Sequence, residues 1–427
     1  MKEMRELIPS LSISLCGLFL MSMTLHLHLD GQYIKPMHYL FILNSMLCFK
    51  NNIELNYADI MSSCVKKTRR YRGSISSLSL IEYVFDSGLS MFFVSTGFSI
   101  LIGIFSNYRN ILEVFMQTDI QKNLLLVCGT ISASFLSGAC SCICTFICVV
   151  FCIFMSISFD FDSDNILLPV IASLSDYICT ISLIYFSENI FISMGKMYPL
   201  NTAEPITVPG FYSQVFITNT LLICMIVAIL GIIYTQIEGT QNLKLFGAWS
   251  LALSFGITMV AGHLINVVST KDVWMGCIIP LFNGIAGSVI LIYVGKVTTY
   301  ISALEIEENF DTISISSAED TKSGSFMSNP NNIKTLYTLI CTATFLAAAA
   351  CCLLKLFFTA IPFMYILFFG ALLNVEIILL YYTTNILVII LQYFDMDVSY
   401  NIVPILNALS DLFGICVLAG ASYLVLV

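Results

Sequence analysis

Long apolar runs separated by short polar segments recur along the whole 427-residue chain. A helix needs about 20 mostly apolar residues to cross the hydrocarbon core of a bilayer. Hydropathy and helical periodicity predict eleven such segments here. They cover residues 9–29, 37–60, 83–105, 123–156, 164–187, 212–235, 245–268, 273–297, 334–358, 362–391 and 401–426. The pattern therefore predicts an all-α integral membrane protein with short connections.

Two polar motifs recur in the second half of the chain, which indicates an internal duplication. Residues 169–176 return as residues 404–411, and both copies begin with proline and end in Leu-Ser-Asp. Almost the same offset pairs residues 50–52 in the second predicted span with residues 286–288 in the eighth. Two motifs in one register favour a duplicated unit over coincidence.

The duplication predicts three regions. A first five-span repeat covers residues 1–188, a connector with the sixth span covers 189–243, and a second five-span repeat covers 244–427. Six spans return the chain to its starting side of the membrane. The two repeats are therefore expected to be parallel and related by an axis along the membrane normal.

Basic residues set the expected orientation. The one dense basic cluster, residues 66–72, lies between the second and third predicted spans, and the positive-inside rule places it in the cytoplasm. The N-terminus is then cytoplasmic as well. The Ser-, Asp- and Glu-containing segment 298–333 falls on the same side and is expected to be a disordered linker, with a regulatory role as the weaker alternative. Either the plasma membrane or an organelle membrane fits this topology.

Composition excludes a soluble protein, because 58% of residues are hydrophobic and only 11% are charged. The net charge of −9 comes from acids gathered in a few loops, so no nucleic-acid partner is expected. Most of the 16 cysteines lie in apolar runs and are interpreted as buried thiols. No nucleophile-base arrangement, Walker loop or HExxH motif is present, so neither an enzyme nor a bound cofactor is expected.

Two aspartates, Asp176 and Asp411, lie inside apolar segments. Counted from Asp164 and Asp397 at the cytoplasmic starts of their helices, both are more than halfway through a core of about 30 Å. A carboxylate at that depth needs a partner or a water-filled path. Hydrogen bonding to a neighbouring helix or protonation would explain one such acid. Two acids at matching repeat positions favour a cation or proton held between them.

Other polar positions add to this region. Pro169 and Pro404 either mark helix starts or free backbone carbonyls for a cavity. The small residues from Asn283 to Ser288 allow close helix packing or expose carbonyls. Glu54, near Asn52, is a further acid without an evident adjacent base. Several other intramembrane groups are interpreted as pairing or snorkelling residues, namely His26, His28, Asp86, His263, Asn374 and Glu376.

These motifs resemble the MgtE-type magnesium channels and transporters, and in particular the eukaryotic solute-carrier branch that fuses two MgtE domains. Residues 161–176 resemble the family's Asn-Pro-Asp-Asn, Pro and Ala-Ser-Leu-Gly-Asp string, and residues 404–414 match its second copy. Residues 50–55 are similar to Lys-Gly-Asn-Leu-Glu-Met, and residues 283–288 to Asn-Gly-Ile-Gly-Gly-Asn. Ser175 and Ser410 replace the family's glycine, and Ser399-Tyr400 replaces its second Asp-Asn pair.

The resemblance implies a magnesium path between the two repeats, lined by the second and fifth spans of each. It places Asp176 and Asp411 at the ion, and Asp164 and Asn165 at the cytoplasmic mouth. It also implies that Asn52 and Ser288 face the path.

The hard oxygen ligands expected around the two aspartates independently favour Mg²⁺, Ca²⁺ or Mn²⁺ over zinc or copper. The predicted function is transport of Mg²⁺, with other divalent cations as further possible cargo. The transporter is expected to act as a monomer with two pseudo-symmetric halves. The main alternative is a proton-coupled or facilitative transporter of an organic solute such as nucleosides. A membrane scaffold without transport is the third possibility.

Overall fold

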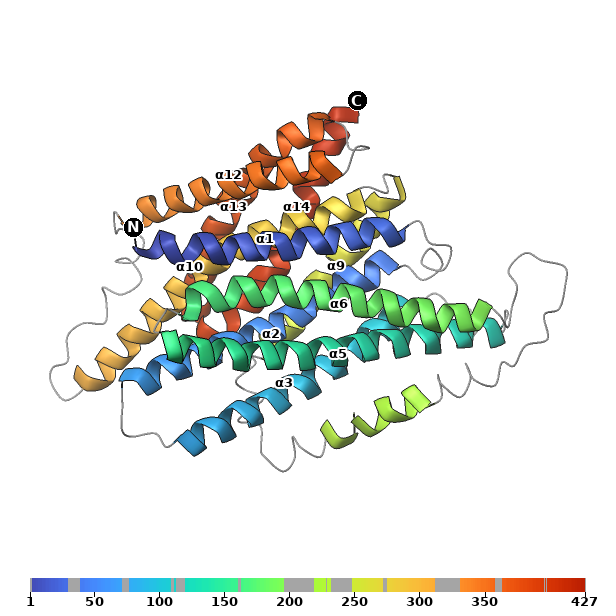
Figure 1. Cartoon of the computed structure of the whole chain (residues 1–427), viewed down its shortest axis with the longest axis horizontal. Coiled ribbons are helices and arrows are strands. Elements are labelled where there is room, and N and C mark those ends of the chain that lie inside the picture. Colours follow the sequence, from blue (N-terminus) through green and yellow to red (C-terminus); the bar gives the residue numbers. More distant parts are fainter. Residues whose placement is uncertain are drawn as a thin grey trace.

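The computed structural model describes residues 2–29, 39–70, 77–108, 111–112, 120–159, 163–195, 219–227, 229–231, 248–271, 275–311, 331–357, 363–394, 396 and 398–426. Within these ranges the regular structure is helical throughout, and the helices form one bundle (Figure 1). They are α1 (Lys2–Leu29), α2 (Tyr39–Arg70), α3 (Ser77–Ser106), α5 (Ile120–Phe159), α6 (Ser163–Gly195), α9 (Ala248–Lys271), α10 (Met275–Asp311), α12 (Asn331–Phe357), α13 (Phe363–Tyr393) and α14 (Val398–Leu426). A shorter apolar helix covers Asn219–Gly231.

The predicted all-α membrane architecture is confirmed. In the described part of the chain, nine helices are long and apolar enough to cross a bilayer. Each of the eleven segments predicted from hydropathy coincides with a helix, including α2 and the helix Asn219–Gly231. These two fall outside the nine because α2 is too polar and the other helix is too short.

Two helices, α2 and α10, form the centre of the bundle. In the apolar window of α10, 94% of the residues are buried, against 33% in the outer helices α5, α9 and α12. The described side chains from Ile42 to Ala58 of α2 are buried as well. A helix that is surrounded by protein can carry polar side chains, because neighbouring helices satisfy them. This explains how α2, which carries several charged and amide side chains, lies at the centre of the bundle.

Both central helices are longer than predicted. Helix α2 continues to Arg70, so most of the basic cluster lies on its last turns and not in a loop. Helix α10 continues to Asp311, so the start of the expected linker 298–333 is helical; residues 312–330 lie outside the described ranges. Hydropathy detects contact with lipid, whereas a helix satisfies its own backbone and can continue into water. The two extensions project from the same end of the bundle (Figure 1).

The helices of the two halves pack in similar pairs. In the N-terminal half α6 packs against α1, α2 and α5, and in the C-terminal half α14 packs against α9, α10 and α13. Cross-contacts between the halves join α1 to α10 and α2 to α9. The α1–α10 contact depends on Gly284, where an added Cβ would lie 2.4 Å from Leu18 Cδ2. The cysteines in the described ranges are free thiols.

Candidate functional site

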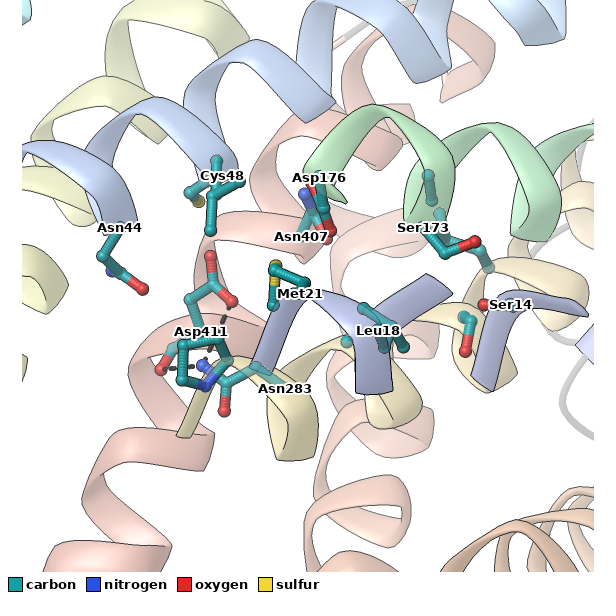
Figure 2. A pocket seen from close by; sticks show the side chains of 17 residues that line it. Ser14, Leu18, Met21, Asn44, Cys48, Ser173, Asp176, Asn283, Asn407 and Asp411 are labelled. Atoms are coloured by element: carbon teal, nitrogen blue, oxygen red, sulfur yellow. Dashed lines mark hydrogen bonds between the residues drawn. The ribbon is translucent and has the colours of Figure 1, made fainter. Parts of the chain in front are cut away.

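A cavity of about 40 Å³ lies where α1, α2, α6, α10 and α14 meet (Figure 2). Asp176 of α6 and Asp411 of α14 both line it. This volume can hold more than one water-sized species, because a single water occupies roughly 10–15 Å³ on this measure. The remaining polar lining comes from Ser14, Asn44, Cys48, Ser173, Asn283, Ser288 and Asn407.

Asp411 is held by a neighbour on α10. Asn283 Nδ2 donates to Asp411 Oδ1 at 3.1 Å and to the Asp411 main-chain carbonyl at 3.3 Å (Figure 2). The thiol of Cys48, on α2, also faces this carboxylate. Asp176 differs, because no hydrogen-bond donor among the described residues reaches its buried Oδ1. The cavity therefore contains one oriented carboxylate and one with a free acceptor oxygen.

The two halves are joined beside the cavity. Asn407 of α14 lines the cavity and donates from Nδ2 to Asn52 Oδ1 at 2.9 Å. Asn52 is fully buried on α2 and does not itself line the cavity. Asn52 was predicted to face an ion path, but in this structure it is linked to the cavity only through Asn407, which bonds it and lines the cavity.

Glu54 does have an adjacent base, contrary to the expectation from the sequence. Lys50 lies one helical turn earlier on α2, and its Nζ is 3.0 Å from Glu54 Oε1 and 3.1 Å from Oε2. Thr145 Oγ1 donates to Oε2 at 2.6 Å, and the hydroxyl of Ser175 also donates to Oε2. Spacing of i and i+4 on one helix brings these charges together. Glu54 is therefore a compensated acid outside the cavity lining.

A second buried acid lies beside Asp411. Glu376 of α13 is completely buried, and its Oε1 accepts a bond from Ser410 Oγ at 3.4 Å. No donor in the described part of the chain reaches its Oε2. Its carboxyl lies in the core next to the site, so it does not snorkel, and Ser410 is a hydrogen-bond partner. Asp86 and His263 are exposed on the outer helices α3 and α9.

The remaining predicted site residues are placed as follows. Pro404 is buried in the second turn of α14, where it removes one backbone donor. Asp164, Asn165 and Pro169 lie in the first turns of α6, but their side chains are outside the described part of the structure, as is all of Asp397. The predicted cytoplasmic mouth is therefore not described.

The donor set fits a hard cation. Among the described residues, no three His, Cys, Asp or Glu side chains gather as a metal-binding group. The cavity instead offers two carboxylates with amide and hydroxyl oxygens from Asn44, Ser173 and Ser288. Mg²⁺ commonly binds one or two carboxylates and keeps several waters, which this arrangement allows.

Comparison with known protein families finds a match for most of the C-terminal half of the chain. Residues 279–421 match the family model of MgtE, described as a divalent cation transporter. These residues form an MgtE domain. The MgtE domain comprises α12, α13, nearly all of α10 and most of α14, and thus includes Asn283, Glu376 and Asp411. No curated protein and no solved structure matches the chain.

The match confirms the expected resemblance for the C-terminal half. With nine candidate spans, the chain is a multi-pass integral membrane protein that carries a divalent cation transporter domain. The family match does not extend over the N-terminal half, which contributes Asp176 to the cavity.

Sequence signals could have found some of the residues that were missed. The bonded pair Ser141 and Ser175 is separated by 34 positions, and so is the pair Glu376 and Ser410. The repeat register that pairs Ser175 with Ser410 thus also pairs Ser141 with Glu376, and Ser141 lies beside the site. Cys48 gives no comparable signal, since its approach to Asp411 depends on the rotation of α2 in the bundle.

Proposed function

We propose that this chain transports Mg²⁺, and other divalent cations of similar chemistry, along a path between its two halves. Asp176 and Asp411 bind the partly hydrated ion. The observation that carries the proposal is that these two acids, one from each half, line the same cavity. The MgtE domain in the C-terminal half supplies the class of cargo.

The proposal includes a second MgtE-like repeat at residues 1–188, joined through 189–243 to the repeat at 244–427. Corresponding helices pack in corresponding pairs in the two halves. The contacting residues Ser141 and Ser175 are 34 positions apart, as are Glu376 and Ser410, although Ser141 Oγ donates to the main-chain carbonyl of Ser175 whereas Ser410 Oγ donates to the carboxylate of Glu376. These likenesses support the duplicated branch of the family, in which a single chain supplies both halves and acts as a monomer.

The proposed orientation keeps the N-terminus in the cytoplasm. It rests on the basic cluster near the end of α2, which the positive-inside rule assigns to that side. The C-terminal extension of α10 leaves the bundle at the same end, as parallel halves require (Figure 1).

The size of the cavity favours an ion over an organic solute. Small-molecule pockets usually enclose about 300–1,000 Å³, far more than the cavity between the two acids. Two carboxylates at membrane depth also need positive charge to offset their repulsion. A divalent cation that retains part of its hydration shell satisfies both conditions.

Expression in cells that depend on an added Mg²⁺ uptake system tests the proposal. Wild-type protein should restore growth and ²⁸Mg uptake, whereas Asp176→Asn and Asp411→Asn should each reduce uptake and the double variant should abolish it. Asp86→Asn, at an exposed acid on α3, serves as the matched control. Undiminished uptake by the double variant, at equal membrane abundance, would refute the site. Uptake of nucleosides with no response to Mg²⁺ would favour the alternative cargo.

A further inference from the structure

Three serines from three different helices line the cavity in addition to the two acids. They are Ser14 of α1, Ser173 of α6 and Ser288 of α10, and all three are buried. Among the described residues of the lining, only Asp176 and Asp411 carry a charge. The serines therefore contribute polar oxygens without charge, and their positions show whether they belong to the acids or form a group of their own.

Helix register brings Ser14 level with Ser288. Helices α1 and α10 run in opposite directions (Figure 1), and they meet where a Cβ added at Gly284 would lie 2.4 Å from Leu18 Cδ2. Residues four positions apart lie on the same face of a helix, about one turn from each other. Ser14 lies one turn before Leu18, and Ser288 lies one turn after Gly284. The two serines thus line the cavity at the same level.

Ser173 approaches the same part of α1 from α6. A Cβ added at Gly17, three residues after Ser14, would lie 3.2 Å from Ser173 Oγ. In Figure 2, Ser14 and Ser173 lie toward one end of the cavity, and Leu18 lies between them and Asp411. The three serines therefore gather at an end of the cavity that is separate from Asp411.

The hydroxyl oxygens at this end are free to accept hydrogen bonds. Ser173 donates its proton to the Val170 carbonyl at 3.1 Å, and Ser288 donates to the Ile285 carbonyl at 3.0 Å. A hydroxyl has one proton and two lone pairs, so both oxygens keep lone pairs for the cavity. The oxygen of Ser14 is buried and has no hydrogen-bond partner among the described residues. A buried polar atom of this kind indicates an occupant that supplies the missing partner.

We propose that Ser14, Ser173 and Ser288 form a second, uncharged binding station for the divalent cation, which we call the serine station. Their oxygens accept hydrogen bonds from the water molecules that a partly hydrated ion retains. Neutral oxygens hold the ion more weakly than carboxylates do, and conduction requires sites that the ion can leave. The station rests on the proposed cation transport and adds a step between the two aspartates and the end of the cavity nearer the start of α1. In the proposed orientation this end faces the cytoplasm.

Uptake of Mg²⁺ by cells that express the full chain tests the serine station. Ser14→Ala and Ser288→Ala should each lower the maximal rate of uptake roughly fivefold, because each removes one hydrogen bond to the ion's water. Ser254→Ala is the matched control, since Ser254 of α9 is fully buried, donates to the Leu251 carbonyl at 2.9 Å and does not line the cavity. It should transport like wild type. If both station variants matched this control at equal membrane abundance, the station would be refuted.

A cysteine at the station distinguishes ion binding from a defect in packing. The experiment uses the Cys48→Ser background, which removes the native thiol of the cavity. Ser14→Cys should then make Mg²⁺ uptake roughly tenfold more sensitive to Cd²⁺, because thiolates favour soft metal ions. Ser254→Cys should leave the sensitivity unchanged, and equal sensitivity of these two variants would also overturn the station. Absence of Mg²⁺ uptake by wild-type protein would refute the proposed transport itself, and the station with it.

Discussion

Asn407 of α14 donates a hydrogen bond to Asn52 of α2 across 2.9 Å, and so joins residues that are 355 positions apart in the chain. Both side chains are buried, Asn52 completely. Because Asn407 also lines the cavity, this bond fixes one wall of the cavity and connects the two halves at membrane depth.

Replacing Asn407 with alanine should destabilise the fold by about 1–3 kcal/mol, because it leaves the Asn52 oxygen buried without a donor. Thermal unfolding of the detergent-solubilised protein measures the loss. Asn189→Ala, at an exposed position on α6, is the matched control and should change little. In a double-mutant cycle, Asn52→Ala should cost less when Asn407 is already alanine. Simple additivity of the two costs would contradict a direct interaction.

Lys50→Met should destabilise the protein by about 3–5 kcal/mol, because it leaves the fully buried Glu54 without the cation that pairs with it. Adding Glu54→Gln should recover most of the lost stability, since the uncompensated charge is then removed. Folded yield and thermal unfolding of the single and double variants provide the measurement. A double variant no more stable than Lys50→Met would show that the lysine acts through other contacts.

Gly414→Ala should abolish the proposed transport. The added methyl group would lie 2.0 Å from Asn283 Oδ1, so the amide must move and lose its bond to Asp411. Gly420→Ala on the same helix is the control, because a Cβ there has no neighbour within 4 Å. Mg²⁺ uptake at equal membrane abundance distinguishes the two variants. Normal uptake by Gly414→Ala would mean that the position of Asn283 is not needed for transport.

The sequence predicted the helices well because lipid contact leaves a strong apolar pattern. Segment 37–60 was predicted as a span even though its helix, α2, falls outside the candidate spans because of its polar residues. The ends of α2 and α10 were placed too early, since hydropathy falls where a helix leaves the membrane, whether or not the helix stops. The basic cluster and the start of the linker were assigned to loops for this reason.

The site was only partly predictable. Register and membrane depth selected Asp176 and Asp411, which the structure brings to one cavity. The Lys50–Glu54 pair was accessible from its i, i+4 spacing but was missed. Cys48 approaches Asp411 from another helix, and this approach depends on helix rotation, which the pattern of apolar and polar residues does not reveal.

Cys48 should make the cavity sensitive to soft metal ions. Its thiol lies against the Asp411 carboxylate, so the lining combines sulfur with oxygen donors. Thiolates favour Cd²⁺ far more than they favour Mg²⁺. We therefore expect Cd²⁺ to inhibit Mg²⁺ uptake, and Cys48→Ser to weaken the inhibition by roughly tenfold, equivalent to about 1.4 kcal/mol. Serine keeps an oxygen at this position, so Mg²⁺ uptake itself should persist.

Cys179→Ser is the control for this experiment, because Cys179 is buried on α6 beside Ser137 and does not line the cavity. Dose-inhibition curves for Cd²⁺ in wild-type and both variants provide the measurement. Equal inhibition of wild-type and Cys48→Ser would place the soft-metal ligand elsewhere among the cysteines. A selective loss in Cys48→Ser would locate the blocking ion at Cys48, which lines the cavity near Asp411.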